Sequence, residues 1–96
     1  MTLEEVKEKL KPIFEKSRVS YAGVFGSVAR GEATDKSDVD ILVKFDGPAT
    51  FSTYLELDEN IKKTLGKEVD VITEGSVNKF LRPFIEKDLK LIYGQR

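Results

Sequence analysis

Apolar and polar positions along the chain form blocks that predict helices separated by short strands. Apolar residues recur at helical spacing over residues 3–14 and again over 51–65, with charged or polar residues between them. Thr2 is a suitable N-cap for the first helix, and Gly66 is suited to end the second. Mostly apolar runs predict strands over residues 21–25, 38–45 and 68–73, and a short final strand over 91–93.

Shorter helical segments are expected between these elements. Residues 28–31 predict one helical turn, and 32–37 a polar turn. Ser76 is expected to cap a helix that carries Val77, Phe80 and Leu81, and Pro83 is expected to open a further turn or helix. Helices alternating with strands predict an α/β or α+β sandwich, a small sheet covered by helices, in one domain over residues 1–96. The pattern does not specify the order or direction of the strands.

Two aspartates interrupt the apolar pattern of the second strand. Asp38 and Asp40 stand one residue apart, directly before Ile41, Leu42 and Val43. Aspartate is rare in strands, so this conflict with local propensity indicates a functional site. Alternate residues of a strand share a face, so both carboxylates point the same way and can hold a hard divalent cation. The alternative is a solvent-exposed pair at a loop edge.

Asp70 repeats the conflict in the third predicted strand, between Val69 and Val71. If the second and third strands are neighbours, Asp70 can join Asp38 and Asp40. Three carboxylates around one or two Mg²⁺ ions are the arrangement that catalyses phosphoryl or nucleotidyl transfer. An edge-strand aspartate facing water is the alternative for Asp70 alone.

A Gly-Ser turn follows the first predicted strand and suits a phosphate. Gly26 allows close approach of the backbone, Ser27 adds a hydroxyl, and N–H groups at the following helix start favour anions. Arg30, one helical turn later, is a candidate cationic contact to the phosphates, although a surface arginine at a helix end is also common.

The amino-acid composition limits which acid–base groups, metals and partners are expected. The chain has no histidine and no cysteine, which leaves carboxylates as acid–base groups and favours Mg²⁺, Mn²⁺ or Ca²⁺ as the metal. The formal net charge is −1, so no global basic field argues for direct binding to nucleic acid. No apolar run is long enough to cross a bilayer, and the start lacks a signal-peptide pattern, so a soluble, cytoplasmic protein is expected.

The combination of these features is more specific than its parts. A Gly-Ser pair, ten residues, then Asp-x-Asp between strands resembles the signature of the DNA polymerase beta-like nucleotidyltransferase superfamily. The run GSVARGEATDKSDVDILV from Gly26 to Val43 is similar to the minimal nucleotidyltransferase (MNT) family, and the resemblance extends over about 21–93.

The resemblance implies the nucleotidyltransferase fold, an α+β arrangement with a small mixed sheet. It implies that Gly26 and Ser27 contact the triphosphate and that Asp38, Asp40 and Asp70 bind the metal. Asp70 would also activate the attacking hydroxyl, and Arg30 matches an arginine that is common in the family.

The resemblance also implies a partner and a reaction. Members of the family transfer AMP from ATP to a tyrosine of a HEPN-domain toxin and act as its antitoxin. Two alternatives remain open from the sequence: a non-catalytic module that masks the toxin in a complex, and a nucleotidyltransferase acting on a small molecule, for which a homo-oligomer could complete the pocket. In a masking complex, aromatic residues such as Phe51, Phe80 and Phe84 would supply apolar contacts to the toxin. The alternative for these residues is ordinary packing in the core.

Overall fold

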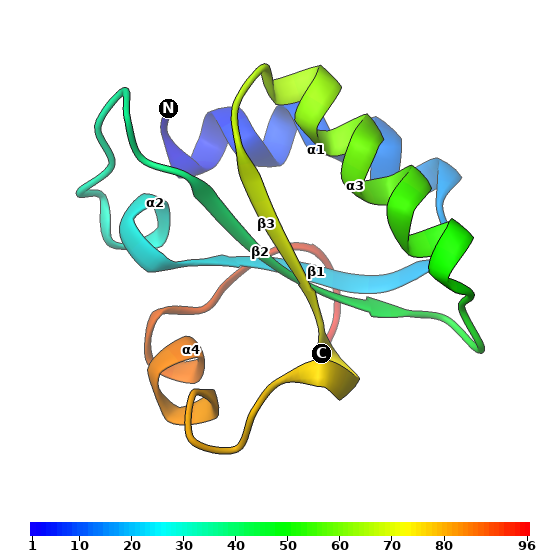
Figure 1. Ribbon diagram of the computed structural model, residues 1–96. Coiled ribbons are helices and arrows are strands. Elements are labelled where there is room, and N and C mark those ends of the chain that lie inside the picture. Colours follow the sequence, from blue (N-terminus) through cyan, green and yellow to red (C-terminus); the bar gives the residue numbers. More distant parts are fainter.

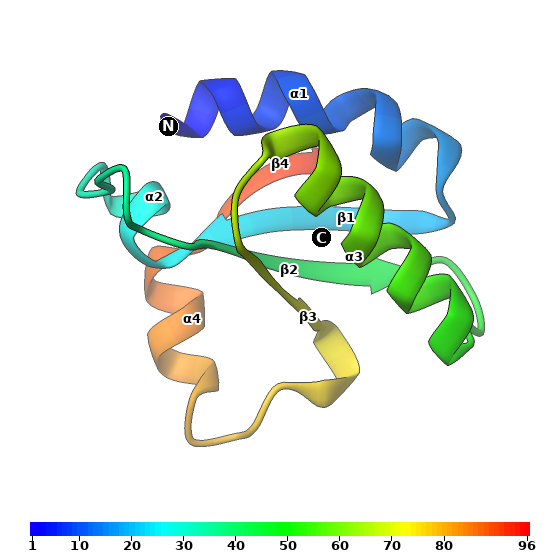
Figure 2. The same ribbon diagram turned by 45° about the horizontal axis from the view of Figure 1, so that its top comes forward.

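A computed structural model describes residues 1–96 as one four-stranded sheet with helices on both faces (Figures 1 and 2). In chain order the elements are α1 (Leu3–Lys16), β1 (Val19–Phe25), α2 (Gly26–Arg30), β2 (Val39–Phe45), α3 (Phe51–Leu65), β3 (Val69–Thr73), the 3₁₀ turn η1 (Glu74–Ser76), α4 (Arg82–Asp88) and β4 (Lys90–Gly94). No helix is long and apolar enough to pass through a membrane.

The strand order is β3-β2-β1-β4, and the sheet is mixed. β1 pairs antiparallel with β2 and with β4, whereas β2 and β3 are parallel. A parallel pair needs a crossover connection, and α3 supplies it. This α+β architecture is the one that the resemblance implied, and it makes β2 a central strand with β1 on one side and β3 on the other.

Helices α1 and α3 cover one face of the sheet and enclose the main core (Figure 2). Val39, Ile41 and Val43 of β2 point into this core and are fully buried. Helix α4 covers part of the other face, where Leu42, Tyr21 and Ile85 form a smaller cluster. The alternating burial of β2 therefore places its even-numbered side chains, including Asp40, on the face that carries α4.

Local signals set most of the element boundaries. Thr2 forms a capping box with Glu5 at the start of α1. Gly66 ends α3 in the left-handed conformation, as predicted. Strands β2 and β3 each begin one residue later than the sequence predicted, at Val39 and Val69.

The helix predicted from Ser76 through Leu81 is wrong. Residues 74–76 form η1, and α4 begins only at Arg82, with Pro83 in its first turn as expected. Asn78 organises the intervening turn: its side chain accepts from the Phe80 N–H, and its carbonyl accepts from the Leu81 N–H. A local side-chain-to-backbone bond thus competes with the helix, and the exposure of Phe80 (73%) removes the packing that would have stabilised one. The short helical segment expected at 28–31 begins earlier, at Gly26.

Candidate active site

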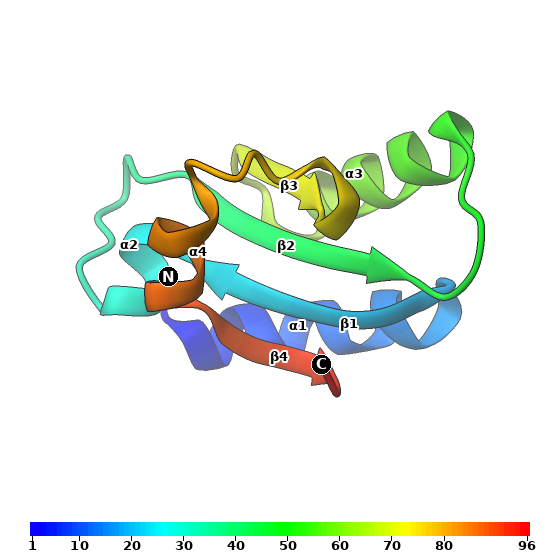
Figure 3. The ribbon, with the colours of Figure 1, turned by 90° about the horizontal axis from the view of Figure 1, so that it is seen from below.

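The candidate residues gather along one line across the sheet. Phe25, the last residue of β1, pairs with Asp40 on β2, and Asp40 pairs with Asp70 on β3. Because β2 and β3 are parallel and in register, Asp40 and Asp70 project from the same face. The Gly26–Ser27 turn follows Phe25 directly, so the turn and both carboxylates lie at one end of the sheet, beside α2 (Figure 3).

Gly26 is in close contact with Asp40. Gly26 has φ +74°, and a Cβ atom built on it would lie 2.3 Å from Oδ2 of Asp40. A side chain at this position would therefore meet the carboxylate as well as adopt a backbone conformation that only glycine takes readily. The sequence predicted that glycine lets a phosphate approach; the structure adds that it makes room for Asp40.

Asp38 and Asp70 are more open than Asp40. Asp38 stands just before β2 and is exposed, Asp40 is half-buried, and Asp70 is exposed on β3. Burial, followed by the charges of Asp70 and Asp38, raises the pKa of Asp40, while the Arg30 guanidinium lowers it in part. Asp70, Asp38 and Arg30 therefore all act electrostatically on Asp40.

The carboxylates do not form a ready cage for a metal. No three acidic side chains lie close enough together to hold one ion as they stand. Their chemistry nevertheless fits a hard divalent cation, because carboxylate oxygens are its preferred ligands and a cation would offset the repulsion that raises the pKa of Asp40. Asp38 and Asp70 are exposed, so their side chains can rotate toward Asp40.

The turn after β1 can bind a phosphate through its individual backbone N–H groups. Helix α2 has only five residues, so a summed peptide dipole contributes little. Ser27 is half-buried in the first turn of α2, and its carbonyl accepts a hydrogen bond from the Glu32 N–H at 2.9 Å. This bond and the left-handed Gly31 close α2 after a single turn.

Arg30 already has acidic partners. Its Nε donates to Glu32 at 3.0 Å, and its Nη1 donates to Asp88 of α4 at 2.7 Å. Sequence reasoning missed both acids. One signal could have found Asp88: an aspartate at the C-terminal end of a helix opposes the helix dipole, which indicates a cationic partner from elsewhere.

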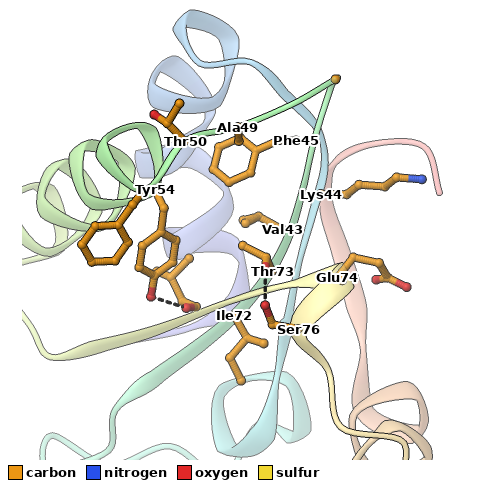
Figure 4. A pocket seen from close by; sticks show the side chains of 14 residues that line it. Val43, Lys44, Phe45, Ala49, Thr50, Tyr54, Ile72, Thr73, Glu74 and Ser76 are labelled. Atoms are coloured by element: carbon orange, nitrogen blue, oxygen red, sulfur yellow. Dashed lines mark hydrogen bonds between the residues drawn. The ribbon is translucent and has the colours of Figure 1, made fainter.

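The largest cavity lies elsewhere. A groove of about 800 Å³ opens between the first turn of α3 and the ends of β2 and β3, lined by residues that include Val43, Tyr54, Val71 and Ser76 (Figure 4). Most of its apolar lining belongs to the face that α3 covers, and only Ile72 belongs to the face to which Asp40 points. The carboxylate site itself is an open surface.

Comparison with known proteins identifies the family. The family described as polymerase beta, nucleotidyltransferase, matches residues 8–96. The chain belongs to this nucleotidyltransferase family. Among its relatives, a candidate protein adenylyltransferase of Methanocaldococcus jannaschii is 46% identical over 95 residues, which cover 92% of this chain and 95% of the relative. The protein adenylyltransferase MntA of Thermococcus cleftensis is 41% identical over 81 residues, 80% of this chain and 82% of that protein.

Solved structures share the nucleotidyltransferase fold. A candidate minimal nucleotidyltransferase superposes with a TM-score of 0.74 at 32% identity. The match covers 94% of this chain and 95% of that chain. A toxin–antitoxin structure with AMP-PNP reaches a TM-score of 0.80 at 21% identity, covering 94% of this chain and 74% of that one. A complex of a tri-AMPylated Shewanella oneidensis HEPN toxin with an MNT antitoxin has a TM-score of 0.71 at 18% identity. The match covers 96% of this chain and 72% of that chain. The last two likenesses concern the fold alone.

Proposed function

We propose that this nucleotidyltransferase is a protein adenylyltransferase that transfers AMP from ATP to a tyrosine hydroxyl of a HEPN-domain toxin and thereby acts as its antitoxin. Membership of the family and the names of relatives at 46% and 41% identity support the reaction class. The single structural observation that carries the proposal is the meeting of three features: the Gly26 turn at the end of β1 lies against Asp40 of β2, and Asp40 pairs with Asp70 of β3.

The residues present suit Mg²⁺ as the metal, with Mn²⁺ as a substitute. Asp38, Asp40 and Asp70 would hold it, and when bound it would neutralise charge on the phosphates during transfer. The Gly26–Ser27 turn would receive the triphosphate, with Arg30 as an additional cationic contact. Gly26 lies against Asp40, so a triphosphate bound at this turn would lie beside the carboxylate.

Asp70 is the candidate to activate the acceptor. It is exposed at the outer strand of the sheet, where an incoming protein can reach it. In the reaction, Asp70 would take the proton of the tyrosine hydroxyl, a bond would form between the tyrosine oxygen and the α-phosphorus, and the bond from the α-phosphorus to pyrophosphate would break. AMP remains on the tyrosine and pyrophosphate leaves.

An intact-mass assay tests this proposal. The protein is incubated with ATP, Mg²⁺ and the protein encoded by the neighbouring gene, and we expect this partner to gain the mass of AMP. Asp40→Asn, nearly isosteric, should reduce the rate by about a thousandfold, because losing one metal ligand removes several kcal/mol of transition-state stabilisation. Asp35→Asn, in an exposed turn, is the control and should retain activity. A partner that stays unmodified with either metal would contradict the proposal.

One observation favours masking as a second candidate function. Three large apolar side chains are exposed next to each other along 80–84: Phe80 (73%), Leu81 (55%) and Phe84 (71%). Such an apolar patch suits contact with a partner protein. If an Asp38→Asn/Asp40→Asn double variant neutralises the toxin as well as the wild type does, masking rather than modification is the mechanism.

A further inference from the structure

Arg30 is held in place by two carboxylates from different parts of the chain. Its Nε contacts Glu32, two residues away, and its Nη1 contacts Asp88, 58 residues away on α4. Neither contact uses Nη2. A guanidinium is planar and rigid, so fixing Nε and Nη1 also fixes the direction of the two Nη2 donors.

The contact to Asp88 joins two elements that flank the carboxylate site. Asp88 is the last residue of α4, which packs on the same face of the sheet as Asp40, and α2 carries both Ser27 and Arg30. Figure 3 shows α4 beside α2 at this end of the sheet. The carboxylate of Asp88 is the better enclosed of the two acids, with a side-chain exposure of 17% against 65% for Glu32.

The position of Asp88 is unfavourable without Arg30. A negative side chain at the last residue of a helix faces the negative end of the peptide dipoles, and partial burial adds a desolvation penalty. Arg30 offsets both costs through a short, charge-assisted hydrogen bond. In return, Asp88 restricts Arg30, whose side chain is 44% exposed.

We infer that Asp88 is a positioning residue for the nucleotide: it holds Arg30 so that Nη2 remains directed to a phosphate of the triphosphate at the Gly26–Ser27 turn. The inference rests on the proposed function, because it concerns the same nucleotide site. It assigns to α4 a role in nucleotide affinity.

Nucleotide affinity tests the inference without requiring turnover. The dissociation constant of AMP-PNP is measured by calorimetry in the presence of Mg²⁺ for the wild type and for Asp88→Asn, which keeps the shape but removes the charge. We expect about tenfold weaker binding, the effect of losing one charge-assisted contact that orients a phosphate ligand. In the adenylylation assay the loss should enter KM for ATP while kcat stays within about twofold of the wild type.

Two controls distinguish a positioning effect of Asp88 from a general change in charge and from loss of the fold. Glu86→Gln removes one acid from the same helix, but Glu86 pairs with Arg96 and Arg82, so AMP-PNP affinity should not change. In an Arg30→Ala background, Asp88→Asn should have no further effect, because Asp88 acts through Arg30. If thermal melting shows that Asp88→Asn is unfolded, Asp88→Glu replaces it, with a smaller loss expected since the charge is kept but displaced.

The outcomes distinguish this inference from the proposed function. Wild-type protein that binds no AMP-PNP overturns the proposed function, and with it the role of Asp88, before any variant is measured. Wild-type binding with unchanged affinity in Asp88→Asn overturns the inference and leaves the function standing. A loss that persists in the Arg30→Ala background, or that Glu86→Gln reproduces, also overturns it.

Discussion

At the scale of single residues, Asp40 is the most constrained part of the site. It is half-buried, it faces Asp70 and Asp38, and its Oδ2 occupies the space where a side chain on Gly26 would lie. Its raised pKa means that the ionised form, which a metal requires, costs the folded protein free energy when no cation is bound. The carboxylate that we propose as a metal ligand is thus unfavourable for the unliganded fold.

Replacing Asp40 should therefore stabilise the metal-free protein. A raised folded pKa favours the protonated form, so the wild type loses stability as pH rises through that pKa, and Asp40→Asn avoids this loss. We expect Asp40→Asn to melt at a higher temperature than the wild type at neutral pH without added metal. The difference should shrink as pH falls and Asp40 becomes protonated. Equal melting temperatures at neutral pH would contradict this account of the carboxylate.

Gly26 and Gly31 form a matched pair for testing the contact with Asp40. Both have positive φ, +74° and +75°, but an added Cβ meets Asp40 only at Gly26 and meets nothing within 4 Å at Gly31. Gly31→Ala should cost about 1–2 kcal/mol of unfolding free energy from backbone strain alone.

Gly26→Ala should cost clearly more than this and should also weaken AMP-PNP binding by tenfold or more, because the carboxylate must move. Urea unfolding and calorimetry measure both quantities. Equal stability losses in the two variants would show that the Asp40 contact is unimportant.

At the scale of elements, a network of charges fastens α4 and the C-terminal residues to the sheet. Glu74, at the start of η1, accepts hydrogen bonds from the Tyr21 hydroxyl and from Arg82 of α4, while Arg96 pairs with Glu86. Burial would raise the pKa of Glu74, but the hydrogen bonds from Tyr21 and Arg82 outweigh it, and the pKa is lowered. The contacts of Glu74 hold α4 against the sheet, whereas the Glu86–Arg96 pair ties the C-terminal residue to α4.

This network predicts acid sensitivity. A carboxylate with a lowered folded pKa stabilises the protein above its unfolded pKa, and the contribution is lost as pH falls through the folded value. Wild-type melting temperature should therefore fall between about pH 5 and pH 3, and Glu74→Gln should show a shallower fall from a lower starting value. Circular dichroism melts over this range provide the measurement. Parallel pH profiles for the two proteins would exclude Glu74 as the responsible group.

Most elements were predictable from the sequence because their signals are local. The helical periodicity of α1 and α3, the Thr2 cap and the terminal Gly66 all act within a few residues. The helix expected from Ser76 was wrong because its apolar residues, Phe80 and Leu81, have no core to pack against. A periodic pattern predicts a buried face only when the fold provides a surface to cover it.

At the scale of the whole molecule, the near-neutral net charge distinguishes this chain from enzymes that bind nucleic acid through a basic surface. Sixteen basic residues stand against seventeen acidic ones, and several of the basic ones, Arg30, Arg82 and Arg96 among them, are engaged in ion pairs. Because the acidic residues balance the basic ones, the molecule has no net positive charge to replace the counterions of a phosphate backbone.

We therefore expect no binding of RNA. Fluorescence anisotropy with a labelled single-stranded RNA should show no micromolar affinity at near-physiological salt. Micromolar binding that weakens steeply with added salt would contradict the prediction and would reopen nucleic acid as an acceptor.

The sequence by itself determined the family, which the comparisons confirm, and the identity of the unusual residues. Three aspartates in apolar runs and a Gly-Ser turn conflict with local propensity, and such conflicts are visible without a structure. Only the tertiary structure decided which of them meet. The parallel pairing of β2 with β3 brings Asp70 beside Asp40, and the antiparallel pairing with β1 brings Gly26 against Asp40. The contact of Arg30 with Asp88 joins residues 58 positions apart. Strand order and such distant pairs result from how whole faces bury against one another, a property that no short stretch of sequence contains.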